Sequence, residues 1–223
     1  IFNTIDLENL DRIQDILDVV EITKEEFDAN IHFLHSIEYV EIKSERVAKV
    51  SDQCLSNYML YYVFFEKRLI AFSDILRIGF LKYKNSTIKF VDILLNVFYS
   101  DKMKDYLTEE ISKVWDEFKV DDKVFGEFVR AFHIFKPEES LLYVSEKIDQ
   151  TEGVDIDINL LEDEENKWNV DIKDSILQLL AGYKKDYGIV EAIELAVRYC
   201  MKKQDAIKWV YSLFKTYYVL KRL

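Results

Sequence analysis

The sequence predicts a mainly α-helical protein with one small sheet near its start, and three observations support this fold class. Only 5 Gly and 1 Pro occur among the 223 residues, too few turn-forming residues for a fold built from many hairpins. Apolar residues make up 49% of the chain, enough to bury the core of one large or two small domains. Outside residues 39–50, the apolar positions recur mostly at the spacing of a helix face.

Residues 1–51 are predicted to form a partial winged-helix domain that begins with two helices. Apolar residues at helical spacing, with Asp6 as the cap, predict a first helix at about 7–19. Thr23 precedes a pair of glutamates, a pattern that predicts a capping box and a second short helix ending near Ser36.

A β-hairpin is predicted to complete this domain. At residues 39–42 and 47–50 the apolar residues alternate with polar ones, as in a strand, instead of recurring at helical spacing. A tight turn is expected between the two stretches, at Ser44-Glu45. Helix, helix and hairpin in this order describe a winged helix, whose opening element we expect upstream of Ile1.

The rest of the chain is predicted to be an irregular array of antiparallel helix pairs joined by short connections. An acidic segment without periodicity, 152–169, is expected to be an exposed loop between a first unit at 52–151 and a second at 170–223. The helices are expected at about 52–68, 72–82, 86–99, 104–118, 121–134, 138–149, 170–185, 187–201 and 203–221.

Charge and cysteine usage limit the partners and the compartment. The formal net charge of −12 disfavours nucleic acid and anionic lipid, so we expect protein partners. No apolar run reaches the roughly 18 residues of a membrane span, so no membrane segment is expected. Cys54 and Cys200 lie in apolar helical patterns, which predicts reduced, buried thiols in a cytoplasmic protein.

The second predicted helix does not have the composition of a DNA-reading helix. Such a helix presents Arg, Lys, Asn or Gln to the major groove. The exposed face of this helix has one basic residue, Lys24, and is otherwise mostly acidic: Glu25, Glu26, Asp28, Asn30 and His32. The domain is better interpreted as a protein-packing module.

Catalytic and metal-binding patterns are weak, so we expect no enzyme and no metal in this chain. No phosphate-binding loop motif exists, and each of the five glycines stands alone. Asp155, Asp157 and Asn159 imitate part of a calcium loop that lacks its glycine and its final glutamate. His32 and His35 lack further ligands and are expected to be structural, one exposed and one packed.

Two aromatic stripes are expected to serve helix packing. The first lacks the interleaved basic residues of a base-stacking site, and the second surrounds well over half of its helix, which favours contact with a partner or a continuation of the chain. The stripes are Tyr58, Tyr61, Tyr62, Phe64 and Phe65, and Trp209, Val210, Leu213, Phe214 and Tyr217.

The segment "VAKVSDQCLSNYMLYYVFF" resembles the region after the ATPase core in bacterial STAND proteins, the signal-transduction ATPases with numerous domains. In these relatives a strand ending in V-x-I/V-S-D-Q is followed by L-S-x-Y-L and an aromatic run. The corresponding residues here are Val47 to Gln53, then Leu55, Ser56, Tyr58 and Met59, where Met59 departs from Leu. The preceding E-E-F, L-x-x-L and V-x-I pattern is similar at Glu25, Glu26, Phe27, Ile31, Leu34, Val40 and Ile42, so the specific resemblance covers about residues 20–70.

The resemblance implies a role for Ser51 and Asp52 in sensing nucleotide state. Better-known relatives end this strand in Met-His-Asp, whose histidine reaches bound ADP, whereas this chain has Val50-Ser51-Asp52. Ser51 is shorter and uncharged, which weakens a direct phosphate contact. The residues themselves leave a second role open, because Ser51 or Asp52 can act simply as the N-cap of the next helix.

The expected function is therefore that of a non-catalytic regulatory and interaction fragment of a STAND-type P-loop ATPase. The resemblance implies that ATP or ADP with Mg binds elsewhere in the parent protein, and that the partners are its upstream ATPase domain and a protein ligand or further copies. Bacterial relatives often act in defence against phage. The alternative is a free-standing α-helical scaffold that binds a protein partner.

Overall fold

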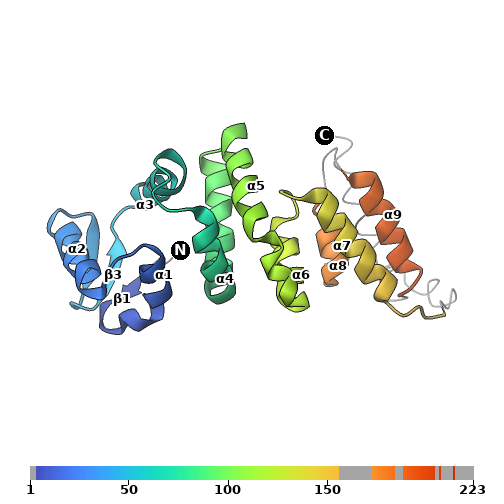
Figure 1. Ribbon diagram of the computed structural model, residues 1–223, viewed down its shortest axis with the longest axis horizontal. Helices are drawn as coiled ribbons and strands as arrows, with labels where there is room; N and C mark the ends of the chain where they lie inside the picture. The colour runs from blue at the N-terminus through green and yellow to red at the C-terminus, as the bar shows by residue number, and fades with distance from the viewer. Residues whose placement is uncertain (1–3, 156–171, 184–187, 204–205, 207–212, 214–223) are drawn as a thin grey trace, which may run out of the picture. The chain divides into compact units, whose positions relative to one another are not determined.

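The computed structural model describes residues 4–155, 172–183, 188–203, 206 and 213. Within these ranges the protein is mainly helical with one small three-stranded antiparallel sheet, which confirms the predicted fold class (Figure 1). No helix in the described part of the chain combines the length and the apolar composition needed to cross a bilayer.

The chain divides into two compact units, Ile1–Phe125 and Gly126–Leu223. The domain boundaries predicted at residue 51 and in the acidic segment 152–169 stay predictions. The first 51 residues pack on later helices of the first unit, and helices from both sides of the acidic segment pack together in the second unit.

The first unit begins with the two helical stretches and the hairpin that the sequence predicts. The sheet has the order β1-β3-β2, and α2 packs on it over a small core of Ile31, Val40 and Ala48. The elements are β1 (Ile5–Asp6), the 3-10 helix η1 (Leu7–Ile13), α1 (Gln14–Val19), α2 (Lys24–Ser36), β2 (Val40–Lys43) and β3 (Val47–Val50).

Local signals in the sequence account for these boundaries. Asp6 accepts a hydrogen bond from the Glu8 amide, and Thr23 forms the predicted capping box with Glu26. Ser44 and Glu45 both have positive φ, +53° and +52°, and the Arg46 amide donates to the Lys43 carbonyl at 3.1 Å, which closes a tight turn at the predicted position. The expected helix at 7–19 is instead divided into η1 and α1, with the backbone of η1 interrupted at Asn9.

Strand β1 was not predicted from sequence. It pairs with β3 through Ile5 opposite Ala48 and Asp6 opposite Val47. A strand of two residues is too short to show an alternating pattern, so only its pairing reveals it.

The rest of the first unit consists of aromatic-rich helices. Helix α3 (Gln53–Tyr61) continues into the π-helical turn η2 (Tyr62–Glu66), and α4 (Phe72–Val97) and α5 (Asp101–Trp115) pack closely together before the 3-10 helix η3 (Glu117–Val120). The predicted helix at 104–118 thus begins earlier, because Ser100 accepts a hydrogen bond from the Met103 amide and caps α5.

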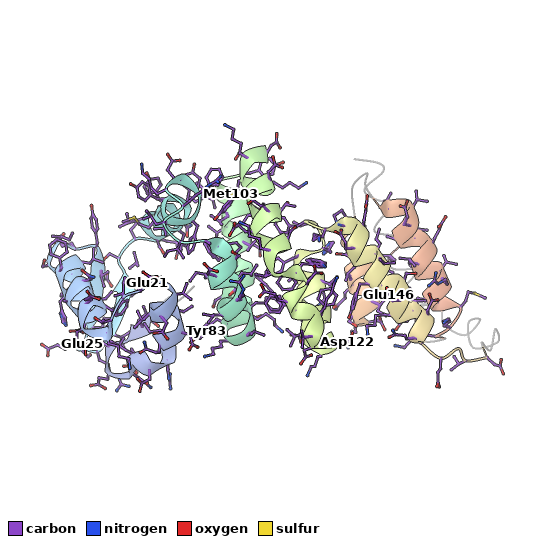
Figure 2. The ribbon with its side chains drawn as sticks, in the orientation of Figure 1. Glu21, Glu25, Tyr83, Met103, Asp122 and Glu146 are labelled. Atoms are coloured by element: carbon purple, nitrogen blue, oxygen red, sulfur yellow. The ribbon has the colours of Figure 1, made fainter. Side chains whose placement is uncertain are left out.

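Helix α4 folds back on itself at Tyr83, whose backbone is not helical (Figure 2). In a straight helix Phe72 and Phe90 would lie about 27 Å apart. Their rings instead meet edge to face, with centroids 5.4 Å apart. The two helices that the sequence predicts at 72–82 and 86–99 are therefore present as the two arms of α4.

The aromatic stripe of the predicted helix at 52–68 serves packing in part. Tyr61 stacks on Phe98 at 4.7 Å between ring centroids, and Phe65 meets Tyr106 edge to face at 5.8 Å. Tyr58, in contrast, is 50% exposed. The stripe is thus a packing surface at its C-terminal end and a solvent-exposed one at its start.

The second unit contains the remaining described helices. Helix α6 (Asp122–Phe132) crosses the boundary between the units, followed by α7 (Pro137–Gln150), α8 (Ser175–Leu180) and α9 (Ile189–Cys200), which packs on both α7 and α8. The predicted helix at 170–185 is found as the shorter α8. Nearly all of the predicted helix at 203–221, with its aromatic stripe, and most of the acidic segment lie outside the described residues; of that stripe only Leu213 is described, and it is buried.

The prediction of two buried thiols is wrong for Cys54, which is exposed, whereas Cys200 is partly buried. Cys54 lies in the first turn of α3, a helix without any buried residue. An apolar sequence pattern does not bury a residue whose helix finds no partner on that side. Burial raises the pKa of the Cys200 thiol.

Candidate functional site

The junction that contains Ser51 and Asp52 lies between β3 and α3, as predicted. Strand β3 ends at Val50 and α3 begins at Gln53. The Ser51 amide donates to the Tyr39 carbonyl at 3.0 Å, which extends the pairing of the hairpin by one bond. Both residues are exposed.

Asp52 is the N-cap of α3, which confirms the structural role predicted for it. Its backbone is extended, with φ −125° and ψ 130°, and its Oδ1 accepts the Leu55 amide hydrogen at 2.7 Å. Such a cap contributes about 1 kcal/mol to helix stability. The carboxylate thus sets where α3 begins.

Both side chains keep unused hydrogen-bonding capacity. Among the described residues, neither the Ser51 hydroxyl nor the second carboxylate oxygen of Asp52 has a hydrogen-bond partner. A serine hydroxyl can donate to a phosphate oxygen, whereas a carboxylate repels phosphate and accepts from an N–H or O–H donor. Ser51 can therefore donate to an anion, and Asp52 can accept from a further donor.

Helix α3 after this junction presents apolar side chains to solvent. Tyr58 and Met59 are 50% and 44% exposed. Helix α3 contacts β3, which precedes it in the chain, and α4, which follows it. The junction thus leads into a helix that is held loosely at its start and firmly at its end, where Tyr61 and the π-helical turn pack.

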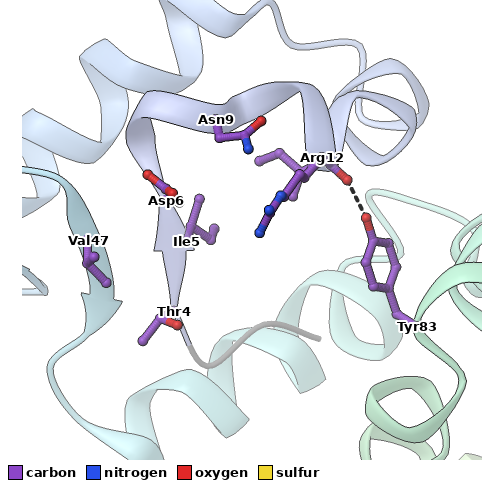
Figure 3. Close-up of a pocket in the computed structure, with 8 residues that line it drawn as sticks. Thr4, Ile5, Asp6, Asn9, Arg12, Val47 and Tyr83 are labelled. Carbon is purple, nitrogen blue, oxygen red and sulfur yellow. Dashed lines mark hydrogen bonds between the residues drawn. The ribbon is translucent and has the colours of Figure 1, made fainter.

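A cavity of about 310 Å³ lies elsewhere in the first unit (Figure 3). It is formed where β1 and η1 face Tyr83, the residue at which α4 folds back. The lining residues are Thr4, Ile5, Asp6, Asn9, Arg12, Ile13, Val47 and Tyr83. The Tyr83 hydroxyl donates to the backbone carbonyl of Arg12 and joins the two walls.

The charges at this cavity are unevenly satisfied. The side chain of Asp6 accepts hydrogen bonds from Nε and Nη2 of Arg46 at 3.1 and 2.9 Å, and Arg46 also pairs with Glu8. The bond from Arg46 holds the pKa of Asp6 below its usual value. Arg12 has no ion-pair partner among the described residues.

Sequence reasoning missed this cavity. Asn9 and Arg12 look like ordinary polar positions on an amphipathic stretch, and Tyr83 is about 70 residues away. The only local signal is the weak helical pattern near Asn9, where the backbone leaves the helical region at φ −133° and ψ 57°.

The candidate metal and catalytic residues do not come together. His32 lies 3.7 Å from Asp28, and a ring nitrogen of His35 lies 2.8 Å from the Val40 carbonyl. Both histidines are exposed, so the expectation that one of the two is packed is wrong. Across the described ranges no group of three potential ligands gathers. Asp157 and Asn159 lie outside these ranges.

Comparison with protein-family models, with curated proteins and with solved structures finds no match for this chain.

Proposed function

We propose that this chain is the regulatory and interaction region of a STAND-type P-loop ATPase, and that the junction at Ser51-Asp52 senses the nucleotide state of the ATPase domain. One observation carries the proposal. The residue that caps the start of α3, Asp52, is exposed beside a serine hydroxyl that has no hydrogen-bond partner among the described residues. A contact made there by a neighbouring domain acts directly on the start of a helix.

The energetics of the cap suit a switch. If a donor on the ATPase domain withdraws the carboxylate of Asp52 from the Leu55 amide, α3 loses about 1 kcal/mol of cap stabilisation. A free-energy change of this size alters a two-state equilibrium about fivefold. The change is large enough to bias a conformation and small enough to reverse.

The packing after α3 supports transmission. Tyr61 and Phe65, at the end of α3 and in η2, contact Phe98 and Tyr106 on the following helices. A displacement of α3 therefore changes contacts with α4 and α5, because aromatic pairs depend on ring geometry.

Weak docking of the first segment supports movement as a rigid body. Besides the contacts of α1 with α4, the polar links between residues 4–50 and α4 include the ion pair of Lys82 with Asp15 and the bond from the Tyr83 hydroxyl to the Arg12 carbonyl. Both partners of the ion pair are substantially exposed, and exposed pairs contribute little to stability. A weak exposed ion pair of this kind can break and re-form when the two helices and the hairpin shift together.

The test is Asp52→Ala in the intact parent protein, with nucleotide content and assembly mass as readouts. We expect less retained ADP and more oligomer, because α3 loses its cap. Asp52→Asn keeps a good capping group and should behave like the wild type if capping carries the effect.

The matched control is Asp121→Ala. Asp121 accepts the amides of Lys123 and Val124 at the start of α6, so its removal also costs a helix cap but lies far from the junction in sequence. Unchanged nucleotide content and mass in Asp52→Ala, or the same change in Asp121→Ala, would refute the proposal.

A scaffold without a nucleotide-linked partner is the second candidate function, favoured by the exposed apolar side chains of Tyr58 and Met59 on α3. On this hypothesis the chain by itself binds its protein partner as tightly as the intact protein does. Tyr58→Ser should then weaken binding, and a requirement for the ATPase domain would contradict the hypothesis.

A further inference from the structure

We propose that the cavity between β1, η1 and Tyr83 is a binding site for a small monocarboxylate with a compact apolar body. The inference rests on the geometry of the cavity and is independent of the function proposed above. Size, wall chemistry, charge and backbone geometry each contribute to it.

The size and the walls fit a small ligand. A volume of about 310 Å³ lies at the lower end of the range of ligand pockets. Ile5, Ile13, Val47 and the ring of Tyr83 supply apolar wall, and Ile13 is buried. An apolar body of a few carbon atoms would gain from burial against these side chains.

Arg12 gives the cavity a positively charged hydrogen-bond donor. In Figure 3 the side chain of Arg12 extends into the space between Ile5 and Tyr83. Among the described residues its guanidinium has no ion-pair or hydrogen-bond partner, and the same holds for the Asn9 amide. A guanidinium presents a planar set of donors that matches a carboxylate with two parallel hydrogen bonds.

The neighbouring acid limits the ligand to a single charge. Asp6 is already paired with Arg46, and Glu8 shares that same arginine. Arg12 is the one cation among the lining residues, and it forms no ion pair within the described residues, although its charge also helps to lower the pKa of Asp6. A triphosphate would bring several negative charges close to Asp6 and Glu8 with one cation to balance them, so a nucleotide does not fit this site.

Backbone irregularities form the site from both sides. Asn9 leaves the helical region within η1, and Tyr83 does so within α4, at φ −134° and ψ 39°. These two breaks place an amide and an aromatic ring at the same cavity, although the residues are 74 positions apart in the chain. A bound carboxylate would contact both walls and hold the first segment against α4.

The experiment uses the chain alone, with sodium benzoate as the probe and benzamide as its uncharged counterpart. Titration calorimetry should give weak benzoate binding, and benzamide should bind at least tenfold more weakly, because it cannot form the charged pair with Arg12. Benzoate should slow amide hydrogen exchange at residues 5–13 and around Tyr83.

Two arginine variants locate the site. Arg12→Met keeps the apolar stem and should reduce benzoate affinity at least tenfold, whereas Arg12→Lys keeps the charge and should lose less. Arg130→Met removes an exposed arginine outside the cavity and should bind like the wild type. Circular dichroism confirms that each variant folds.

The proposal is overturned if benzoate does not bind, if Arg12→Met binds it unchanged, or if ATP binds at the same residues as tightly. None of these outcomes bears on Asp52 and the nucleotide-sensing junction, because the ATPase domain is absent from this experiment.

Discussion

Replacing Glu110 by Ala should destabilise the first unit far more than its place on a polar-looking helix suggests. Glu110 is only 3% exposed, and its Oε2 accepts the Ser73 amide hydrogen at 2.8 Å at the start of α4. The residue before α4, Ala71, has no side chain that can cap the helix. Glu110 therefore caps α4 from another helix, and its Oε1 also pairs with Lys113.

The expected cost of Glu110→Ala is about 2 to 3 kcal/mol, because it removes a charge-assisted hydrogen bond and leaves a buried amide unsatisfied. Glu109→Ala is the control. Glu109 pairs with the same Lys113 at 3.1 Å but is largely exposed, so its loss should cost about 0.5 kcal/mol or less. Urea unfolding followed by circular dichroism and tryptophan fluorescence gives both values.

The pH dependence of stability provides a second measurement. Burial alone would raise the pKa of Glu110, but the hydrogen bonds from Lys113 and Ser73 outweigh it and hold the pKa below 4.5. The stabilisation is therefore complete above about pH 4.5 and is lost as the pH falls through the lowered folded-state pKa. Glu110→Gln should lack this pH-dependent part of the stability. Equal costs for Glu110→Ala and Glu109→Ala would refute the reasoning.

Two further predictions concern close packing and a helix end. Gly79→Ala would place a Cβ 2.6 Å from Oγ1 of Thr87 between the arms of α4. We expect the single variant to lose about 1 kcal/mol or more of stability, and Thr87→Ala to relieve this loss in the double variant. Equal stability of the single and double variants in thermal unfolding would contradict this. The Lys202 ammonium donates to the carbonyls of Ile148, Asp149 and Thr151 at 2.8, 3.1 and 3.1 Å. Lys202→Met should therefore lower the stability of the second unit by about 1 to 2 kcal/mol. Lys173 is exposed, and Lys173→Met is the control, whose loss of stability must be smaller.

The elements that could be predicted from sequence are those with a local cause. The capping box at Thr23 and the N-cap at Asp52 each act within three residues, so the sequence contains both partners of the bond. The hairpin turn at Ser44-Glu45 was likewise visible between two alternating stretches. The nucleotide-sensing role of Ser51 and Asp52 stays a prediction, because the proposed nucleotide contact is not made by residues of this chain.

Predictions about burial were less successful than predictions about local structure. Cys54 lies in an apolar pattern but is exposed, whereas Glu110 is charged but buried. Periodicity indicates which residues share a face of a helix, but the burial of that face depends on a neighbour from another part of the chain.

By itself, the sequence determined the helical class, most helix boundaries and the junction at Asp52, because turn content, apolar spacing and capping are interactions between residues a few positions apart. Only the tertiary structure decided that α4 folds back at Tyr83, that Glu110 caps a helix 37 residues away, and that Arg12 faces a cavity. These features depend on contacts between distant segments, whose free energies appear only when the chain has brought the partners together.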